Sequence, residues 1–201
     1  AAAVKDSTIL PQNGTVEVGV VQFADTIPGD ARVEVPQTVI DSQTTADAVG
    51  AAISNIVHAT GWTPTAAGIT LATQQMMASA NWGVASKRII NLSTDGPPWS
   101  EGAEPNFLDP AVGLAETASD NAVAAGITEI DAEAVGWVET WLNGPPLPLD
   151  WLKDEIVYPQ PGVIIPPGGA YPSSPGSAGF VAKVTSWDDY AEAIYQGEPK
   201  Y

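Results

Sequence analysis

The stretch Lys87-Arg88-Ile89-Ile90-Asn91-Leu92-Ser93-Thr94-Asp95-Gly96 decides the fold class, because a buried strand runs directly into an acidic turn. Its apolar centre is typical of a strand in a parallel sheet that is covered on both faces. The carboxylate that follows lies at the carboxyl edge of such a sheet, where open α/β sheets bind ligands. The stretch therefore predicts an α/β fold with a binding edge.

A hairpin and a helix precede this strand. The apolar run Val16–Phe23 and the alternating run Ala31–Val35 flank the turn signal Pro28-Gly29-Asp30, which predicts two antiparallel strands. A helix is expected from about Thr44 to Ala59, with Asp41 or Ser42 as its cap. Its predicted buried face follows helical spacing and consists of Val49, Ala52, Ile53, Ile56 and Val57.

The remaining elements alternate in type. A second helix is expected to start at Thr63, whose hydroxyl would cap it, with Pro64 at the first helical position. Strands alternating with helices predict a mainly parallel sheet with helices on both faces. Further predicted elements are a helix at 110–125, a strand at 127–135, a short helix at 149–157, a strand at 180–184 and a terminal helix at 187–194.

The 201 residues are expected to form a single domain, 1–201. Residues 158–179 contain six prolines and no usable periodicity, which predicts an extended arm or a long surface loop. The chain begins with alanine, so we expect a processed or excised product.

The charge balance excludes several partners. With 24 acidic and 7 basic residues the formal net charge is −17, so the cations needed to bind nucleic acid or an anionic membrane surface are missing. The absence of cysteine excludes disulfides and thiolate metal sites. No apolar run approaches the roughly 20 residues that cross a bilayer, so membrane insertion is not expected. The excess of acidic over basic residues fits a secreted or surface-exposed protein.

Two loops resemble parts of the metal-ion-dependent adhesion site of von Willebrand factor A (vWA) domains. They are Gly61-Trp62-Thr63-Pro64-Thr65 and the acidic turn at Asp95-Gly96. The resemblance implies a Rossmann-like vWA fold, a metal ligand at Thr63, and Asp95 at or just outside the first coordination shell. The hard oxygen donors suit Mg²⁺ or Ca²⁺. Helix cap and turn are the purely structural alternatives for these two residues.

The third loop of that site, Asp-x-Ser-x-Ser after the first strand, does not occur in this sequence. The site is therefore incomplete, and metal binding is expected to be weak or absent in this chain alone. Ala1–Lys5 resembles the last turn of the helix that follows the first strand. The chain is similar to secreted bacterial vWA-like proteins, with which it shares the motifs Asn91–Gly96, Ala124–Ile127 and Asp188–Ile194.

The resemblance thus implies a sheet without its first central strand. Unpaired backbone groups in a sheet centre cost about 1–3 kcal/mol each, so a strand from elsewhere is expected to complete the sheet. Three sources stay open: a cleaved N-terminal piece, a strand donated by a neighbouring subunit, and a sequence that is incomplete at its start.

Trp62 and Trp99 bracket the predicted site, and with Thr65 they are the candidate ligand-binding residues. Exposed aromatic rings beside a crevice suit a protein or a sugar ring, whereas the alternative is that both cover the edge of the core. The only histidine, His58, has no serine elbow beside it, so no catalytic residue is assigned.

Three functions follow in order of preference. The first is a non-enzymatic, secreted or cell-surface vWA-like binding module with a partial adhesion site. The second is a structural subunit of an extracellular fibre or sheath, which self-assembles through a donated strand. A hydrolase ranks well below both.

Overall fold

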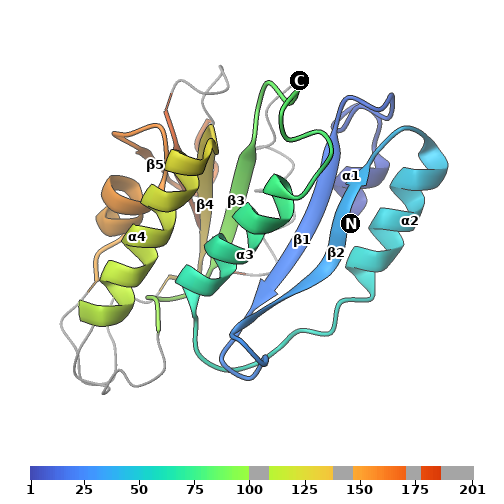
Figure 1. Ribbon diagram of the computed structural model, residues 1–201. Helices are drawn as coiled ribbons and strands as arrows, with labels where there is room; N and C mark the ends of the chain where they lie inside the picture. The colour runs from blue at the N-terminus through green and yellow to red at the C-terminus, as the bar shows by residue number, and fades with distance from the viewer. Residues whose placement is uncertain (100–108, 138–146, 171–177, 187–201) are drawn as a thin grey trace.

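The computed structural model describes residues 1–99, 109–137, 147–170 and 178–186. Its strands form two separate sheets (Figure 1). One is an antiparallel pair, β1 (Glu17–Phe23) and β2 (Ala31–Val39). The other is wholly parallel with strand order β3-β4-β6-β5, and its strands are Ile89–Thr94, Glu129–Val135, Phe180–Val184 and Val163–Ile165. The predicted combination of a mainly parallel sheet and an antiparallel hairpin is confirmed.

The β1–β2 hairpin closes through a left-handed turn. Gly29 and Asp30 have φ values of +77° and +66°, the region that glycine and aspartate tolerate best. Pairing runs from Glu17 opposite Val39 to Phe23 opposite Ala31, with register shifts around Val20. The second strand therefore extends four residues past its predicted end at Val35.

Helices cover both faces of the hairpin. Helix α2 (Gln43–Ser54) packs with Val18 and Val20 of β1, and α3 (Thr65–Met77) belongs to the cluster that includes Phe23. Because side chains alternate along a strand, positions 20 and 23 lie on opposite faces. The remaining helical segments are α1 (Ala2–Lys5), α4 (Asp109–Ala125) and the π-helical turn η1 (Leu152–Ile156).

Helix α2 corrects two predictions. The Ser42 hydroxyl does cap it, accepting the Thr45 N–H at 3.3 Å, but the helix ends at Ser54, five residues before the expected Ala59. Val57 was expected on its buried face and is instead 76% exposed. The chain leaves the helix early because the backbone of residues 57–59 is bound by side chains of the hairpin.

The start of α3 was also predicted wrongly. The helix begins at Thr65 with Pro64 in the capping position, and no side chain caps it. Thr63 contributes its carbonyl oxygen, which accepts the N–H groups of Thr65 at 2.8 Å and Trp99 at 2.7 Å. The residue therefore joins two loops and does not cap the helix.

Residues 158–179 are not wholly an arm. Within this segment Val163–Ile165 forms the edge strand β5, which pairs in parallel with β6. Three apolar residues between prolines gave no periodicity to detect. The short helix expected at 149–157 is the π-helical turn η1, and the helix expected at 187–194 lies outside the described residues.

The main core lies between the parallel sheet and the helices α3, α4 and η1, and a smaller core joins the hairpin to α2. Within the described residues, no strand pairs with the free edge of β1 or with the free edge of β3. Every residue of β1 is partly exposed, and Asn91 in the middle of β3 is exposed. This separation agrees with the expected loss of a central strand. None of the helices in the described ranges has the length and apolar character to span a membrane.

Candidate functional site

The candidate site lies where the carboxyl ends of β1 and β3 approach the loop between α2 and α3. A cavity of about 220 Å³ opens there. It is lined by the end of β1, by His58, by Gly61–Thr63 and by Ser93–Asp95. The two predicted metal ligands, Thr63 and Asp95, therefore line one cavity, although they are 32 positions apart in the sequence (95 − 63).

Asp25, at the end of β1, positions the Trp62 loop. Its carboxylate accepts the Trp62 N–H at 2.8 Å, while the Asp25 N–H donates to the Trp62 carbonyl at 3.3 Å. Gly61 has a φ of +123°, and a Cβ added there would lie 1.8 Å from Asp25 Oδ1. Only glycine lets the loop approach this closely. Asp25 was not predicted from the sequence, where the available signal was a carboxylate two residues after the strand.

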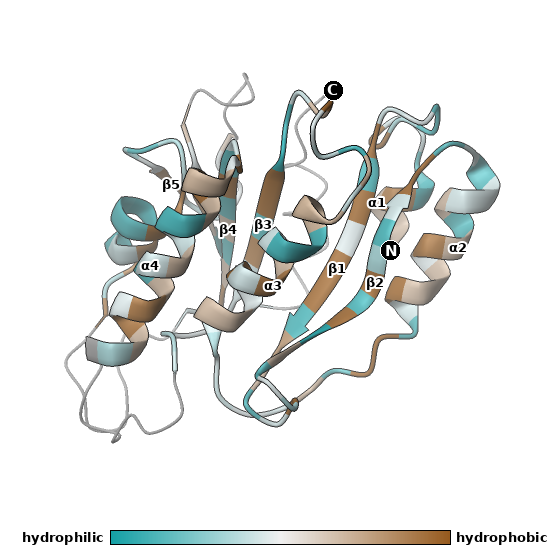
Figure 2. Cartoon of the chain, in the orientation of Figure 1, coloured by the Kyte–Doolittle hydropathy of each residue, from teal (hydrophilic) through white to brown (hydrophobic). Residues whose placement is uncertain are grey.

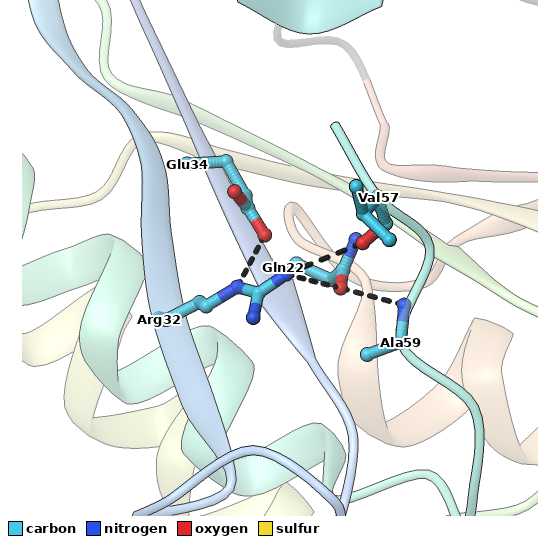
Figure 3. A network of polar contacts seen from close by, with 5 residues as sticks. All are labelled: Gln22, Arg32, Glu34, Val57 and Ala59. Carbon is cyan, nitrogen blue, oxygen red and sulfur yellow. Dashed lines mark hydrogen bonds and ion pairs between the residues drawn. The ribbon is translucent and has the colours of Figure 1, made fainter. Parts of the chain in front are cut away.

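A polar network ties the preceding residues to the hairpin (Figure 3). The Arg32 guanidinium donates to the Val57 carbonyl at 3.2 Å and to Glu34 at 2.5 Å. The Gln22 side-chain oxygen accepts the Ala59 N–H at 2.8 Å. These bonds run from β1 and β2 to the backbone of residues 57–59, and they fix the path of the chain toward Gly61.

The structure brings Trp62 and Trp99 together. Their rings stack with centroids 6.5 Å apart and an interplanar angle of 15°. The stack is supported by the bond from the Trp99 N–H to the Thr63 carbonyl. Trp62 is 47% exposed, so the pair presents an aromatic surface at the rim of the cavity.

Thr65 lies deeper than the two tryptophans. It is 2% exposed, and its hydroxyl is 3.4 Å from the Thr63 carbonyl, which it approaches as donor. A bound molecule at the rim would not reach it in this arrangement. Its contact with a ligand stays a prediction.

The donors at the cavity do not by themselves make a metal centre. Divalent Mg²⁺ and Ca²⁺ take six or more oxygen ligands. Thr63 and Asp95 offer one hydroxyl and one exposed carboxylate. Among the described residues there is no group of three or more histidine, cysteine, aspartate or glutamate side chains placed to hold an ion. A metal here needs further ligands from outside these loops.

A second polar feature was missed by the sequence analysis. Glu129, Asp131 and Glu133 alternate along β4 and share one face of the sheet, yet they are 4%, 3% and 0% exposed. Burial raises the pKa of Asp131 to about 8; the Phe180 N–H bond at 3.0 Å opposes this rise, and the charges of Glu129 and Glu133 add to it. Glu133 accepts from Ser93 at 3.1 Å, and Lys87 lies 3.9 Å from Glu129. Acidic residues at every second position of an apolar strand were the available signal.

Comparisons with known proteins bear on the fold. The family model described as von Willebrand factor type A domain matches residues 3–135. A structure of the pilus adhesin SpaC from Lactobacillus rhamnosus GG in an open conformation has a TM-score of 0.50 and 16% sequence identity, and the match covers 69% of this chain and 22% of the adhesin. A second structure of SpaC gives a TM-score of 0.49 and 17% identity, covering 68% and 21%. The chain thus spans about a fifth of the adhesin's length. No protein with a curated description matches it.

Proposed function

Since the chain belongs to the von Willebrand factor type A domain family, we propose that it is a non-enzymatic binding module of the adhesion type. The supporting observation is that Thr63, Asp95 and Trp62 line one cavity at the carboxyl ends of the strands, and that Trp99 stacks on Trp62. The ligand is a protein or glycan that supplies a carboxylate to a divalent ion, and it packs on the exposed Trp62 ring.

In this proposal the ion is Mg²⁺ or Ca²⁺, held by the Thr63 hydroxyl and, directly or through water, by Asp95. This chain alone binds the ion weakly, because two donors leave most of its coordination sphere unfilled. The Asp25–Trp62 bonds keep the Thr63 loop at the cavity, so the two donors need little reorganisation when further ligands arrive.

We place the protein outside the cell or on its surface. The net charge of −17 suits an environment rich in divalent cations. A pilus adhesin has a similar fold, which supports this location by analogy.

Calorimetric titration with Mg²⁺ and Ca²⁺ tests the site. Two proteins are compared: this chain, and a longer version that carries an Asp-x-Ser-x-Ser strand ahead of Ala1. We expect weak binding by the first and saturable binding by the second, lost on Asp95→Ala and kept on Asp120→Ala, an exposed carboxylate of α4. Failure of the longer version to bind either ion rejects the adhesion mechanism.

A second candidate function is favoured by the open edges of β1 and β3. A strand inserted between them would join the two sheets, which is the way that donated strands link subunits of surface fibres. In this alternative the protein is a structural subunit of an extracellular fibre or sheath. Negative-stain microscopy and light scattering of the purified protein test this alternative, since a strict monomer would contradict a fibre subunit.

A further inference from the structure

Trp62 is the only exposed aromatic side chain among the described residues, with 47% of its surface accessible. The ring of Trp99, which is half-buried, stacks against it with an interplanar angle of 15°. We call the exposed part of the Trp62 ring, with Trp99 as its support, the Trp62 platform. Tryptophan is enriched at binding surfaces because its flat ring offers a large contact area, so the platform is a candidate for ligand contact in its own right.

The loop that carries the platform is fixed by hydrogen bonds from the hairpin. Asp25 binds the Trp62 backbone twice, at its N–H over 2.8 Å and at its carbonyl over 3.3 Å. The Thr26 hydroxyl donates to the Thr60 carbonyl at 2.5 Å. A ring on a loop held in this way loses little conformational freedom when a ligand packs on it. The platform is therefore preorganised for binding.

The surroundings of the platform are polar. His58 and Asp95 are exposed and line the same cavity as Trp62. Within the part of the chain that the structure describes, neither side chain has a hydrogen-bond partner, so the ring nitrogens and the carboxylate oxygens are open to a ligand. The hairpin turn and the last part of the loop before α3 are mostly teal or pale (Figure 2). A ligand on the platform therefore meets an apolar ring with hydrogen-bonding groups beside it.

The platform does not have the apolar surroundings of a protein interface. Stable protein interfaces bury about 800 Å² on each partner around an apolar centre. Among the described residues, the other exposed large hydrophobic side chains are Val57 in the same loop and, on other segments, Met77, Val84, Leu114, Val163 and Ile164. The aromatic surface is therefore not the centre of a large apolar patch, and a small ligand with both apolar and polar groups suits it better.

A pyranose ring has this combination of groups. A sugar whose hydroxyls are all equatorial carries its axial C–H groups on two flat faces, and these pack on the electron-rich face of an indole. Its hydroxyls point outward near the plane of the ring, where they exchange hydrogen bonds with groups such as His58 and Asp95. The net charge of −17 disfavours an acidic sugar in the absence of a cation. The platform therefore favours a neutral, glucose-type unit.

From these contacts we infer that the Trp62 platform binds a neutral glycan through one pyranose ring with equatorial hydroxyls, which stacks on Trp62 and is hydrogen-bonded to His58. The inference rests on the proposed binding function and narrows its ligand to a glycan. The stacked unit needs no ion. A carboxylate that meets a divalent ion at Asp95 belongs to another unit of the same glycan.

Saturation-transfer difference NMR with cellotetraose, a β-linked glucose oligomer, tests the inference in the presence of EDTA. It is measured on the 201-residue chain and on the longer version with the Asp-x-Ser-x-Ser strand. We expect transfer to the ring C–H protons of cellotetraose and none to glucitol, an open-chain polyol that has hydroxyls but no ring. Tetraproline is the peptide probe, because proline-rich segments dock on aromatic side chains.

Variants locate the contact when the NMR signal is titrated to give a dissociation constant. Trp62→Ala should weaken cellotetraose binding at least about tenfold, and Trp62→Phe, which keeps a smaller ring, should retain part of it. His58→Ala should weaken binding several-fold through the lost hydrogen bond. Met77→Ala is the matched control, because Met77 is 49% exposed on α3, and it should leave binding unchanged.

Three results would overturn the inference. Absence of cellotetraose binding to both proteins contradicts the glycan, and binding that survives Trp62→Ala contradicts the stacked ring. Binding of tetraproline in place of cellotetraose would assign Trp62 to a protein partner. Unchanged binding by His58→Ala would contradict the hydrogen bond to that residue. The metal titration uses no sugar and the sugar titration uses no divalent ion, so the two proposals fail separately.

Discussion

Asn91 and Asp131 are paired residues of neighbouring parallel strands, yet Asn91 is exposed and Asp131 is 3% exposed. Two paired positions in the middle of a sheet normally share one environment, since their side chains stand about 5 Å apart on one face. Here the environment changes across a single strand, because β3 is the edge strand of its sheet and β4 is an inner strand. The difference marks the position at which the sheet is open.

The first prediction concerns the buried carboxylate of this pair. Asp131 has a pKa of about 8 in the folded protein, whereas the ordinary pKa of 3.8 applies in the unfolded chain, which therefore binds fewer protons between these two values. The contribution of Asp131 to the free energy of unfolding is complete below about pH 4 and is lost as the pH rises toward 8. Asp131→Asn, which can still accept the Phe180 N–H, should raise the free energy of unfolding at neutral pH by about 1–3 kcal/mol.

Urea unfolding across this pH range measures the effect. The control is Asp120→Asn, which removes the same charge from an exposed position of α4. We expect the pH dependence to flatten in Asp131→Asn alone. If the free energy of unfolding depended on pH equally in Asp131→Asn and in the unmodified chain, burial of the Asp131 carboxylate would not be the cause of that dependence.

The second prediction concerns the loop that carries Trp62. Gly61→Ala forces a left-handed φ onto alanine and brings its Cβ against Asp25, which should cost about 1–3 kcal/mol. Gly29→Ala is the matched control, because Gly29 has a φ of +77° with nothing within 4 Å of an added Cβ. Thermal unfolding should rank Gly61→Ala as clearly the less stable; equal losses would contradict the Asp25 contact.

The third prediction concerns the packing of α3 on β1. A Cβ at Gly68 would lie 2.6 Å from the Phe23 ring, so Gly68→Ala should destabilise the protein by about 1–3 kcal/mol. Gly113 also lies in a helix, α4, and an added Cβ there meets nothing within 4 Å. Gly113→Ala should therefore stabilise by about 0.5–1 kcal/mol through helix propensity. Denaturant unfolding of both variants checks the opposite signs, and a shared sign would contradict the close approach of α3 to β1.

The fourth prediction concerns the aromatic stack. Two indoles with centroids 6.5 Å apart should give an exciton couplet in circular dichroism. Trp62→Phe and Trp99→Phe should each remove the couplet. Trp82→Phe should keep it, because Trp82 lies under the Arg88 guanidinium and belongs to no tryptophan pair among the described residues. A couplet that survives in either of the first two variants would show that the rings do not stack in solution.

The sequence predicted the elements whose signals are local. The apolar centre of the strand at Ile89–Thr94 and the turn at Gly29 depend on neighbouring residues only, and both elements were predicted correctly. The end of α2 depends on bonds from Arg32 and Gln22, which belong to other elements, so the helix was predicted too long. Strand β5 has three residues, too few to show a period.

The residues of the candidate site were likewise predicted only in part. Asp95 was predicted from a strand end and Thr63 from a helix start that the structure moves to Thr65, and the structure places both residues at one cavity. Asp25 and the carboxylates of β4 escaped because their roles arise from burial and from contacts across the fold. The sequence showed that the three acidic residues of β4 alternate along one strand, but it did not show that this strand is buried.

Residue-resolved hydrogen exchange on β3 is the most direct test of the opening between the two sheets. We expect alternate amides of β3 to exchange slowly, where they face β4, and the intervening amides to exchange fast, where they face the free edge of the sheet. Uniform slow exchange along β3 would contradict the account.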